Sequence, residues 1–258
     1  MFGIHPIIDY INNVETVEQA GGQVPANYRA ILNRWREYQN IEKPNREALI
    51  QAIIDHKSNA DLGELKALAL AEMVGQVDES SLYQELQPPT FIALRNAYQA
   101  VAETNYTKLA KAWAEKATEF TNCADVIDPA TPAAHLMHAN DEIRSAWSRG
   151  QTLSVELTSM MAPVIAAAEL AGVQIGMGLY GAPATFALFA KPGPKGRRNA
   201  WDAWNSDNRW NELNKLGIKI EASTLADHTP YRQPMTMEWI PGAINRQVDP
   251  EIEIESNL

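Results

Sequence analysis

Apolar residues recur at helical spacing through the first two thirds of the chain. Between residues 28 and 38 they stand three or four positions apart, which is the repeat of a helix with one buried face. Pro25 and Pro44 suit the start of a helix, and Asp61 suits a helix N-cap. The pattern therefore predicts helices that begin near residues 25, 44 and 61, with the third ending at Gly75.

Two further helices are predicted between residues 88 and 149. Pro88 and Pro89 mark the start of a long helix, in which apolar and aromatic residues continue to Phe120. A helix unbroken to residue 122 would be roughly 50 Å long, since each residue adds about 1.5 Å. Another helix is expected over residues 132–149, with its end at Gly150.

The pattern changes after Gly150. Residues 153–190 carry two charges, and residues 170–190 carry none. A short helix rich in tryptophan is expected to end near Gly217. Three later segments alternate polar and apolar residues, as a half-buried strand does: 219–221, 235–239 and 251–255. We therefore expect a mainly α fold, with a helical N-terminal two thirds and a small α+β C-terminal part that contains short strands. The expected domains are residues 1–150 and 151–258.

Composition and charge exclude several classes of protein. The 258 residues are 45% hydrophobic and 21% charged, which is typical of a globular protein and not of a disordered chain, a collagen or a polytopic membrane protein. Lys and Arg total 22 and Asp and Glu total 32, so the formal net charge is −10, which argues against a general nucleic-acid binder. Cys123 is the single cysteine, so an intrachain disulfide is excluded.

The N-terminus lacks the pattern of a secretory signal. No basic stretch followed by an apolar run is present there, so we expect no signal peptide. The expected location is the cytoplasm or an assembled particle, which also fits a chain that does not rely on disulfides.

Two histidines and a carboxylate are candidate metal ligands. His135 and His138 are three residues apart on an expected helix, and Glu142 follows four residues after His138, so these side chains would share one face. The alternative is a solvated polar face, because a zinc site needs three or four ligands and no second ligand pair is visible. No G-x-S-x-G motif occurs either, and we expect no cofactor and no catalytic residue.

Small residues are spaced for close contact between helices. Ala168, Gly172 and Gly176 repeat every four positions, which would let two helix backbones approach each other. We expect these residues to form an interface between subunits, together with Ile252 and Ile254 of the predicted C-terminal strand. The alternative is packing within one chain.

A basic segment follows the uncharged region. Two tryptophans come next in the sequence. The basic residues and the tryptophans together suggest a surface for an anion or a nucleic acid, with these cations: Lys191, Lys195, Arg197 and Arg198. If the chain contacts nucleic acid, we expect that contact at this segment only. The alternative is an exposed loop that leads into an amphipathic helix.

The uncharged run also raises the question of a membrane. Its 21 residues, 170–190, reach the length of about 20 that spans a bilayer, and basic and aromatic residues follow it. Four glycines and a proline make the run weakly apolar, which favours burial within a protein core or an assembly. Insertion of the segment around residues 153–190 into a membrane is the alternative.

These features together favour an assembly function. We expect a non-enzymatic structural protein in a homo-oligomer or a larger complex, for which a viral (phage) particle component such as a minor head or tail protein is a concrete version. Two alternatives are a membrane-active protein that inserts the segment around residues 153–190, and a metal-dependent enzyme with a His and carboxylate site on a helix.

Overall fold

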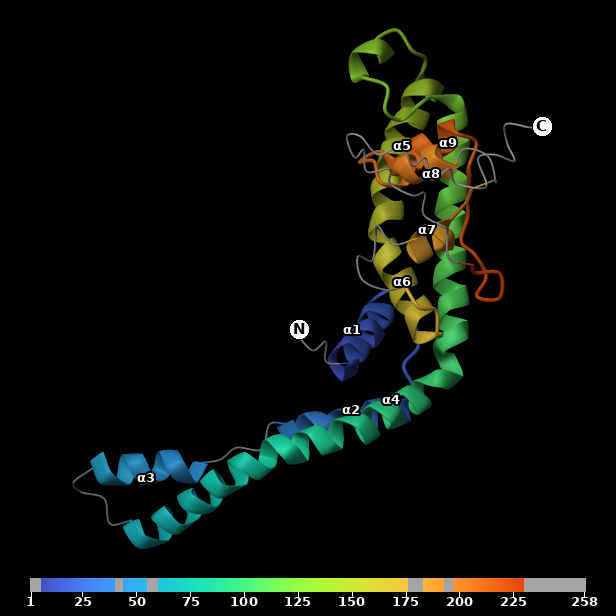
Figure 1. Cartoon of the computed structure of the whole chain (residues 1–258). Helices are drawn as coiled ribbons and strands as arrows, with labels where there is room; N and C mark the ends of the chain where they lie inside the picture. The colour runs from blue at the N-terminus through green and yellow to red at the C-terminus, as the bar shows by residue number, and fades with distance from the viewer. Residues whose placement is uncertain (1–5, 40–43, 55–59, 176–182, 193–196, 230–258) are drawn as a thin grey trace, which may run out of the picture. The chain divides into compact units, whose positions relative to one another are not determined.

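The computed structural model describes residues 6–39, 44–54, 60–175, 183–192 and 197–229 (Figure 1). It is 76% helical, with nine α-helices and one two-stranded antiparallel sheet in the described ranges. The expected mainly α fold, with short strands in the C-terminal part, is confirmed.

The described elements are helices, apart from two short strands. In the first half they are α1 (Pro6–Gln19), α2 (Ala26–Gln39), α3 (Pro44–Ile54) and α4 (Leu62–Val126). In the second half they are a 3₁₀ turn, η1 (Ala133–Leu136), then α5 (Asp141–Ser159), α6 (Met161–Leu170), α7 (Pro183–Phe189), β1 (Ala190–Lys191), α8 (Arg197–Trp204), α9 (Arg209–Lys215) and β2 (Lys219–Ile220). The helix starts predicted near residues 25, 44 and 61 are thereby confirmed.

The chain divides into two compact units, and neither unit is one continuous segment. Unit 1 comprises residues 1–12 and 23–101, and unit 2 comprises residues 13–22 and 102–258. Both α1 and α4 therefore contribute residues to each unit. The predicted boundary between residues 150 and 151 stays a prediction of the sequence, and Gly150 lies inside α5.

Aromatic side chains of α1, α2 and α4 form the core of unit 1. Tyr98 of α4 is fully buried and lies at their centre. The ring of Tyr10 meets the rings of Phe91 and Tyr98 edge-on, with centroid distances of 5.5 and 6.3 Å. Tyr28 meets Tyr98 in the same way at 5.8 Å. This geometry is the favoured one for aromatic pairs, so the cluster holds three helices together.

The sequence predicted two helices where the structure has the single helix α4. The helix passes through Pro88 and Pro89, and the end expected at Gly75 is also wrong. A proline inside a helix costs about 3 kcal/mol, because it lacks an N–H and crowds the preceding turn. Packing offsets this cost on both sides of the prolines. Trp35 stacks on Tyr83 before them, at 5.4 Å between centroids, and the aromatic cluster of unit 1 follows them.

The helix expected over residues 132–149 is also different in the structure. Its first part is η1, and α5 begins only at Asp141, where the side-chain oxygen of Asn140 accepts the backbone N–H of Ile143 at 2.9 Å. The helix then continues through Gly150 to Ser159. A Cβ atom at Gly150 would lie 2.8 Å from Cγ of Pro129, so glycine serves there to let two segments approach, and not to end the helix.

We expect Gly150→Ala to destabilise unit 2. The new methyl group would overlap the Pro129 ring, and such overpacking costs about 1–3 kcal/mol. The gain in helix propensity, about 1 kcal/mol, offsets part of this cost. Urea denaturation of the full chain measures the difference, with the exposed Ser145→Ala on the same helix as the control. A Gly150→Ala variant more stable than the wild type would contradict the close approach.

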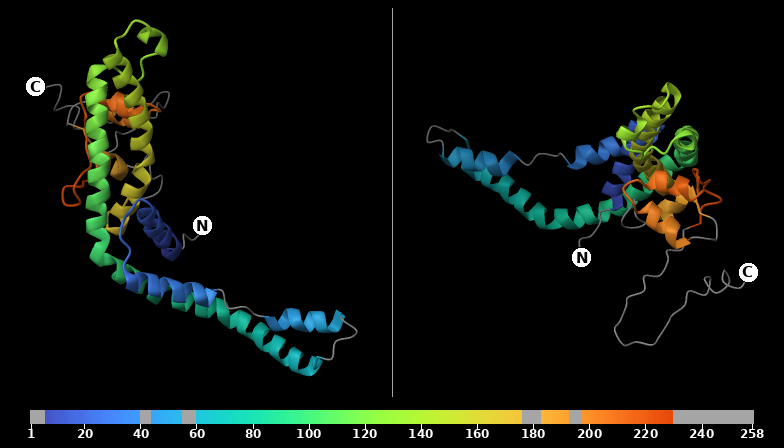
Figure 2. Two further views of the ribbon diagram at one scale, coloured as in Figure 1. Left: turned by 180° about the vertical axis from the view of Figure 1, so that it is seen from behind. Right: turned by 90° about the horizontal axis from the view of Figure 1, so that it is seen from above.

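In unit 2, the C-terminal half of α4 runs beside α5, and the later elements pack along this pair (Figures 1 and 2). Five fully buried aromatic side chains fill the space between them: Trp113, Phe186, Phe189, Trp204 and Trp210. Trp113 lies 4.8 Å from Phe189 and 5.4 Å from Trp210 between ring centroids, and its Nε1 donates to the carbonyl of Leu157 at 3.1 Å. Trp113 thus connects the pair of long helices to the C-terminal elements.

The small sheet completes unit 2. β1 and β2 are antiparallel, with Ala190 opposite Ile220, so the strand predicted at residues 219–221 is confirmed in β2. Beyond it, the N–H of Ser223 donates to the carbonyl of Leu188 at 2.9 Å, and the hydroxyl of Tyr106 donates to the carbonyl of Ser223 at 2.5 Å. The predicted tryptophan-rich helix is two helices, α8 and α9. The strands predicted at 235–239 and 251–255 lie outside the described residues.

Candidate interaction surface

The candidate metal ligands do not come together. His135 lies in η1, His138 follows η1, and Glu142 lies in the first turn of α5, all of them exposed. The single helix face that would have joined them is interrupted where Asn140 caps α5. Within the described ranges, no three His, Cys, Asp or Glu side chains are placed to hold one ion.

The predicted cations are also engaged or lie outside the described residues. Nζ of Lys191 is 2.6 Å from Oε1 of Glu221, and Lys219 contacts the same carboxylate. The hydrogen bond to Glu221 raises the pKa of Lys191 above its ordinary value. Arg197 and Arg198 begin α8 and have interactions of their own, and Lys195 lies outside the described residues. Anion or nucleic-acid contact at these residues stays a prediction.

The small-residue ladder is interrupted by the end of α6. Ala168 is fully buried within the chain, and α6 stops at Leu170. Gly172 follows with a φ of +103°, its N–H donates to the carbonyl of Glu169, and the N–H of Val173 donates to the carbonyl of Ala168. These bonds form a Schellman helix end, in which glycine is favoured for its backbone and not for close packing. Gly176, Ile252 and Ile254 lie outside the described residues, so the predicted interface remains a prediction.

The apolar stretch that meets the length requirement for a membrane span covers α5 and α6. Residues Asp141–Leu170 are long and apolar enough by length and composition, and half of their most apolar window is buried inside the chain. The fully buried side chains there include Leu153, Leu157 and Met161. Burial of this kind is what the core helix of a protein shows, so length and composition alone do not assign the stretch to a bilayer.

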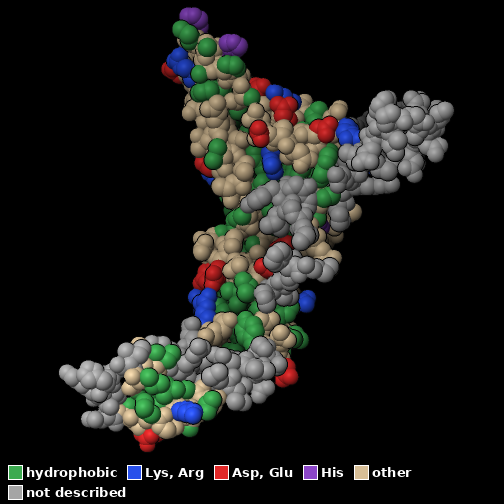
Figure 3. All heavy atoms as spheres, turned by 60° about the vertical axis from the view of Figure 1, so that its left-hand side comes forward, with side chains coloured by type: hydrophobic (Ala, Val, Ile, Leu, Met, Phe, Trp, Pro, Cys, Tyr) green, Lys and Arg blue, Asp and Glu red, His purple; other side chains and the backbone are tan. Residues whose placement is uncertain are grey.

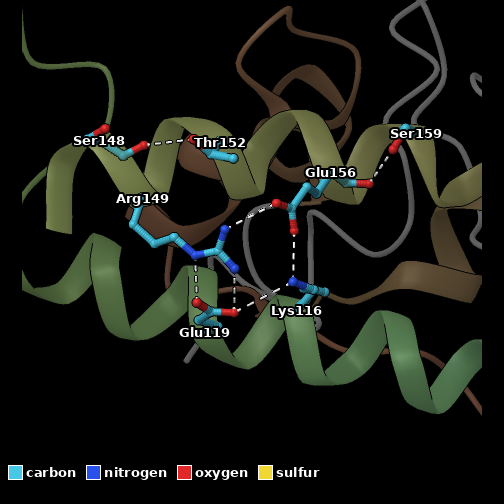
Figure 4. A network of polar contacts seen from close by, with 7 residues as sticks. All are labelled: Lys116, Glu119, Ser148, Arg149, Thr152, Glu156 and Ser159. Atoms are coloured by element: carbon cyan, nitrogen blue, oxygen red, sulfur yellow. Dashed lines mark hydrogen bonds and ion pairs between the residues drawn. The ribbon is translucent and has the colours of Figure 1, made fainter. Parts of the chain in front are cut away.

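An ion-pair network joins α4 and α5 (Figure 4). Nε of Arg149 donates to Oε1 of Glu119 at 2.6 Å, and its Nη1 donates to Oε1 of Glu156 at 3.1 Å. Lys116 completes the network, with Nζ 2.9 Å from Oε2 of Glu156. The hydrogen bond from Arg149 lowers the pKa of Glu119, and the one from Lys116 lowers the pKa of Glu156. Both carboxylates stay ionised at neutral pH. The network is therefore suited to stabilising the packing of α4 on α5 and not to general acid catalysis.

This network predicts a loss of stability in acid. A carboxyl group with a lowered pKa in the folded state stabilises the fold above its unfolded pKa of about 4.3 and stops doing so as the pH falls through the folded pKa. We expect Glu119→Gln with Glu156→Gln to flatten the decline in stability below pH ~4.5. Urea denaturation from pH 3 to 7 tests this, with the exposed Glu142→Gln as control. Identical pH profiles for the double variant and the wild type would contradict it.

Cys123 has the surroundings of a weak nucleophile. It is half-buried, and burial, followed by the charge of Glu119, raises the pKa of its thiol. The thiol is therefore protonated at neutral pH, whereas the reactive form of cysteine is the thiolate.

A shallow cleft of about 310 Å³ lies where η1 meets α5. Its lining is mostly apolar and consists of Ala133, Leu136, Met137, Arg144, Trp147 and Ser148. The guanidinium of Arg144 is 2.5 Å from Asp141, and Nε1 of Trp147 donates to the carbonyl of Thr131 at 2.9 Å. Since both groups already have partners, the cleft lacks the convergent polar groups that orient a small ligand.

The most unusual surface of the described chain lies on α3 and the first turns of α4. Five large apolar side chains are 39–63% exposed there, and we call them the α3–α4 apolar surface: Ile50, Ile53, Leu62, Leu68 and Leu70. Ala69 is the one buried residue among 48–53 and 60–71. Figure 3 shows hydrophobic side chains gathered at the lower end of the view, where these helices lie. Large apolar side chains gathered on a protein surface often mark an interaction site.

Sequence reasoning did not find this surface. The apolar pattern predicted helices that begin near residues 44 and 61, and the helices of a packed core produce the same pattern. The signal that could have revealed this surface is the width of the apolar face, which is larger than one neighbouring helix can cover.

Comparison with known proteins adds no assignment to this geometry. The chain matches no protein-family model, no curated protein and no solved structure.

Proposed function

We propose that the chain is a non-enzymatic structural protein that works in a homo-oligomer or a larger complex. A component of a viral (phage) particle, such as a minor head or tail protein, is a concrete version of this function. The observation that carries the proposal is the α3–α4 apolar surface, which unit 1 leaves exposed to water.

Energetics support this interpretation. Burial of a leucine or isoleucine side chain contributes about 1.5–3 kcal/mol, so five half-exposed ones leave several kcal/mol of stabilisation available to an interface. Protein association uses such apolar centres, surrounded by polar side chains. Glu64 and Lys66 are exposed beside the apolar residues and would supply part of that polar rim.

The mass of the protein in solution tests the proposal. Size exclusion with light scattering, without detergent, is expected to give a discrete multiple of 28.6 kDa. A monomer of 28.6 kDa at every concentration up to about 100 µM would contradict a homo-oligomer, because a working interface of standard size binds more tightly than that.

A second candidate is a membrane-active protein, because residues Asp141–Leu170 have the length and composition of a membrane span. Flotation with liposomes of neutral and of anionic lipid distinguishes it. Cofloating protein would support membrane insertion, and protein that stays at the bottom with both lipids would contradict it.

A further inference from the structure

We propose that Pro88 and Pro89 form a hinge in α4, and that α2 is the latch that keeps the helix continuous there. The hinge lies between the first turns of α4, which carry part of the α3–α4 apolar surface, and the aromatic cluster of unit 1. All of the residues involved belong to unit 1. The hinge does not require the chain to assemble.

The adjacent prolines leave a gap in the backbone hydrogen bonds of α4. A proline has no N–H, so the carbonyls four residues earlier, those of Gln84 and Glu85, lose their helical partners. A proline also disfavours the helical backbone of the residue before it, which here applies to Gln87 and to Pro88 itself. Sharp bends in helices occur mostly at proline. The backbone of α4 is therefore easiest to bend at this point.

The prolines lie on the side of α4 that faces water. Pro88 and Pro89 are exposed, whereas Tyr98, about 180° around the helix from Pro89, is fully buried. Gln84 and Glu85 are exposed as well, so water can hydrogen-bond to their carbonyls. Bending at the prolines thus breaks few further hydrogen bonds. The resistance to bending must come from packing on the opposite side of the helix.

The packing on that side comes from α2, which contacts α4 before and after the prolines (Figure 1). Tyr28 of α2 meets Tyr98 with 5.8 Å between ring centroids. Trp35 stacks on Tyr83 at 5.4 Å, and Nε2 of Gln39 donates to the hydroxyl of Tyr83 at 3.4 Å. Tyr28 and Trp35 are buried on one face of α2, because seven residues make about two helical turns. One short helix therefore joins the two parts of α4.

The other contacts of the aromatic cluster leave the first part of α4 unattached. Among the ring contacts of the described residues, Tyr10 of α1 meets Phe91 and Tyr98, which both follow the prolines. The stack of Trp35 on Tyr83 lies before the prolines, with the two ring planes 26° apart. This stack is therefore the contact whose loss should release the hinge.

Hydrogen exchange of the full chain tests the latch. Trp35→Ala removes the stack, so we expect exchange in residues 83–93 to rise by about tenfold or more, and exchange in residues 94–101 to rise by less than about threefold. Trp35→Phe keeps a ring that can stack on Tyr83 and is expected to behave like the wild type. Arg34→Ala changes an exposed neighbour on α2 and is the control. Unchanged exchange in Trp35→Ala, or an equal rise in both segments, would overturn the proposal.

Replacement of both prolines tests the hinge. Pro88→Ala together with Pro89→Ala restores the N–H groups that the carbonyls of Gln84 and Glu85 lack. In this background we expect Trp35→Ala to accelerate exchange in residues 83–93 by less than about threefold, because the helix no longer needs α2 to stay continuous. An acceleration as large as in the wild-type background would show that the prolines are not the hinge.

Distances between two spin labels measure the bend itself. Lys66→Cys and Arg95→Cys, in a Cys123→Ser background, place the labels at exposed positions of α4 before and after the prolines. We expect Trp35→Ala to broaden the distribution of distances and the two proline replacements to narrow it again. A distribution that Trp35→Ala leaves unchanged would contradict a hinge held by α2.

Discussion

Replacement of Trp113 by alanine is expected to lower the free energy of unfolding of unit 2 by about 3–5 kcal/mol. Trp113 is fully buried and packs against Phe189 and Trp210. Its loss would leave a large cavity and remove the donor to the carbonyl of Leu157. The free energy of unfolding of a protein is typically only about 5–15 kcal/mol, so this one change would remove a large part of the stability of unit 2.

Urea denaturation followed by circular dichroism measures this loss, and hydrogen exchange locates it. We expect faster exchange in residues 102–126 and 141–170, which form the long helices around Trp113. Lys111→Ala changes an exposed residue of the same helix and is expected to alter stability by less than about 0.5 kcal/mol. A loss below about 1 kcal/mol for Trp113→Ala would show that the aromatic cluster does not hold unit 2 together.

The second large effect is expected in unit 1, from Tyr98→Ala. Tyr98 is fully buried and makes edge-on contacts with both Tyr10 and Tyr28, so its removal weakens the packing of α1 and of α2 on α4 at once. We expect a loss of about 3–5 kcal/mol, as for other large aromatic side chains replaced by alanine. Because α4 passes through two prolines just before this cluster, the same loss should also loosen the helix near Pro88 and Pro89.

Hydrogen exchange of the full chain distinguishes the two units. Tyr98→Ala is expected to accelerate exchange in residues 23–39 and 83–101 more than in residues 141–170, since Tyr98 and its partners belong to unit 1. Gln99→Ala, which changes an exposed neighbour, serves as the control. Equal acceleration in both units would mean that they unfold as one cooperative block.

Local signals in the sequence predicted part of this fold. Pro25 and Pro44 correctly predicted the starts of α2 and α3, and the alternation at residues 219–221 correctly predicted β2. These predictions succeeded because each depends only on a few neighbouring residues. Pro88 and Pro89 led to a wrong prediction, because a helix start was expected there and α4 continues through both residues. Their effect on the backbone is local, whereas the packing that offsets it joins Tyr83 to Trp35, 48 residues earlier in the chain.

The interaction surface was harder to predict than the helices that form it. The apolar pattern of residues 62–70 indicates a helix but does not state how much of its face another element covers. For His138 and Glu142 the error was of another kind. Their spacing implies one helix face, but the helix starts between them, and the preference of Asn140 for the N-cap position was the signal that could have shown this.

The interleaved make-up of the two units affects how the chain can fold during synthesis. Asn13 belongs to unit 2, and its side chain donates to Glu169 at 2.8 Å, across 156 residues of sequence. At about 5–20 residues per second, a ribosome needs roughly 8–31 s to make the chain between them. The early segment around residues 13–22 must therefore wait for its partners, and a fragment that starts at residue 102 would lack a piece of its own unit.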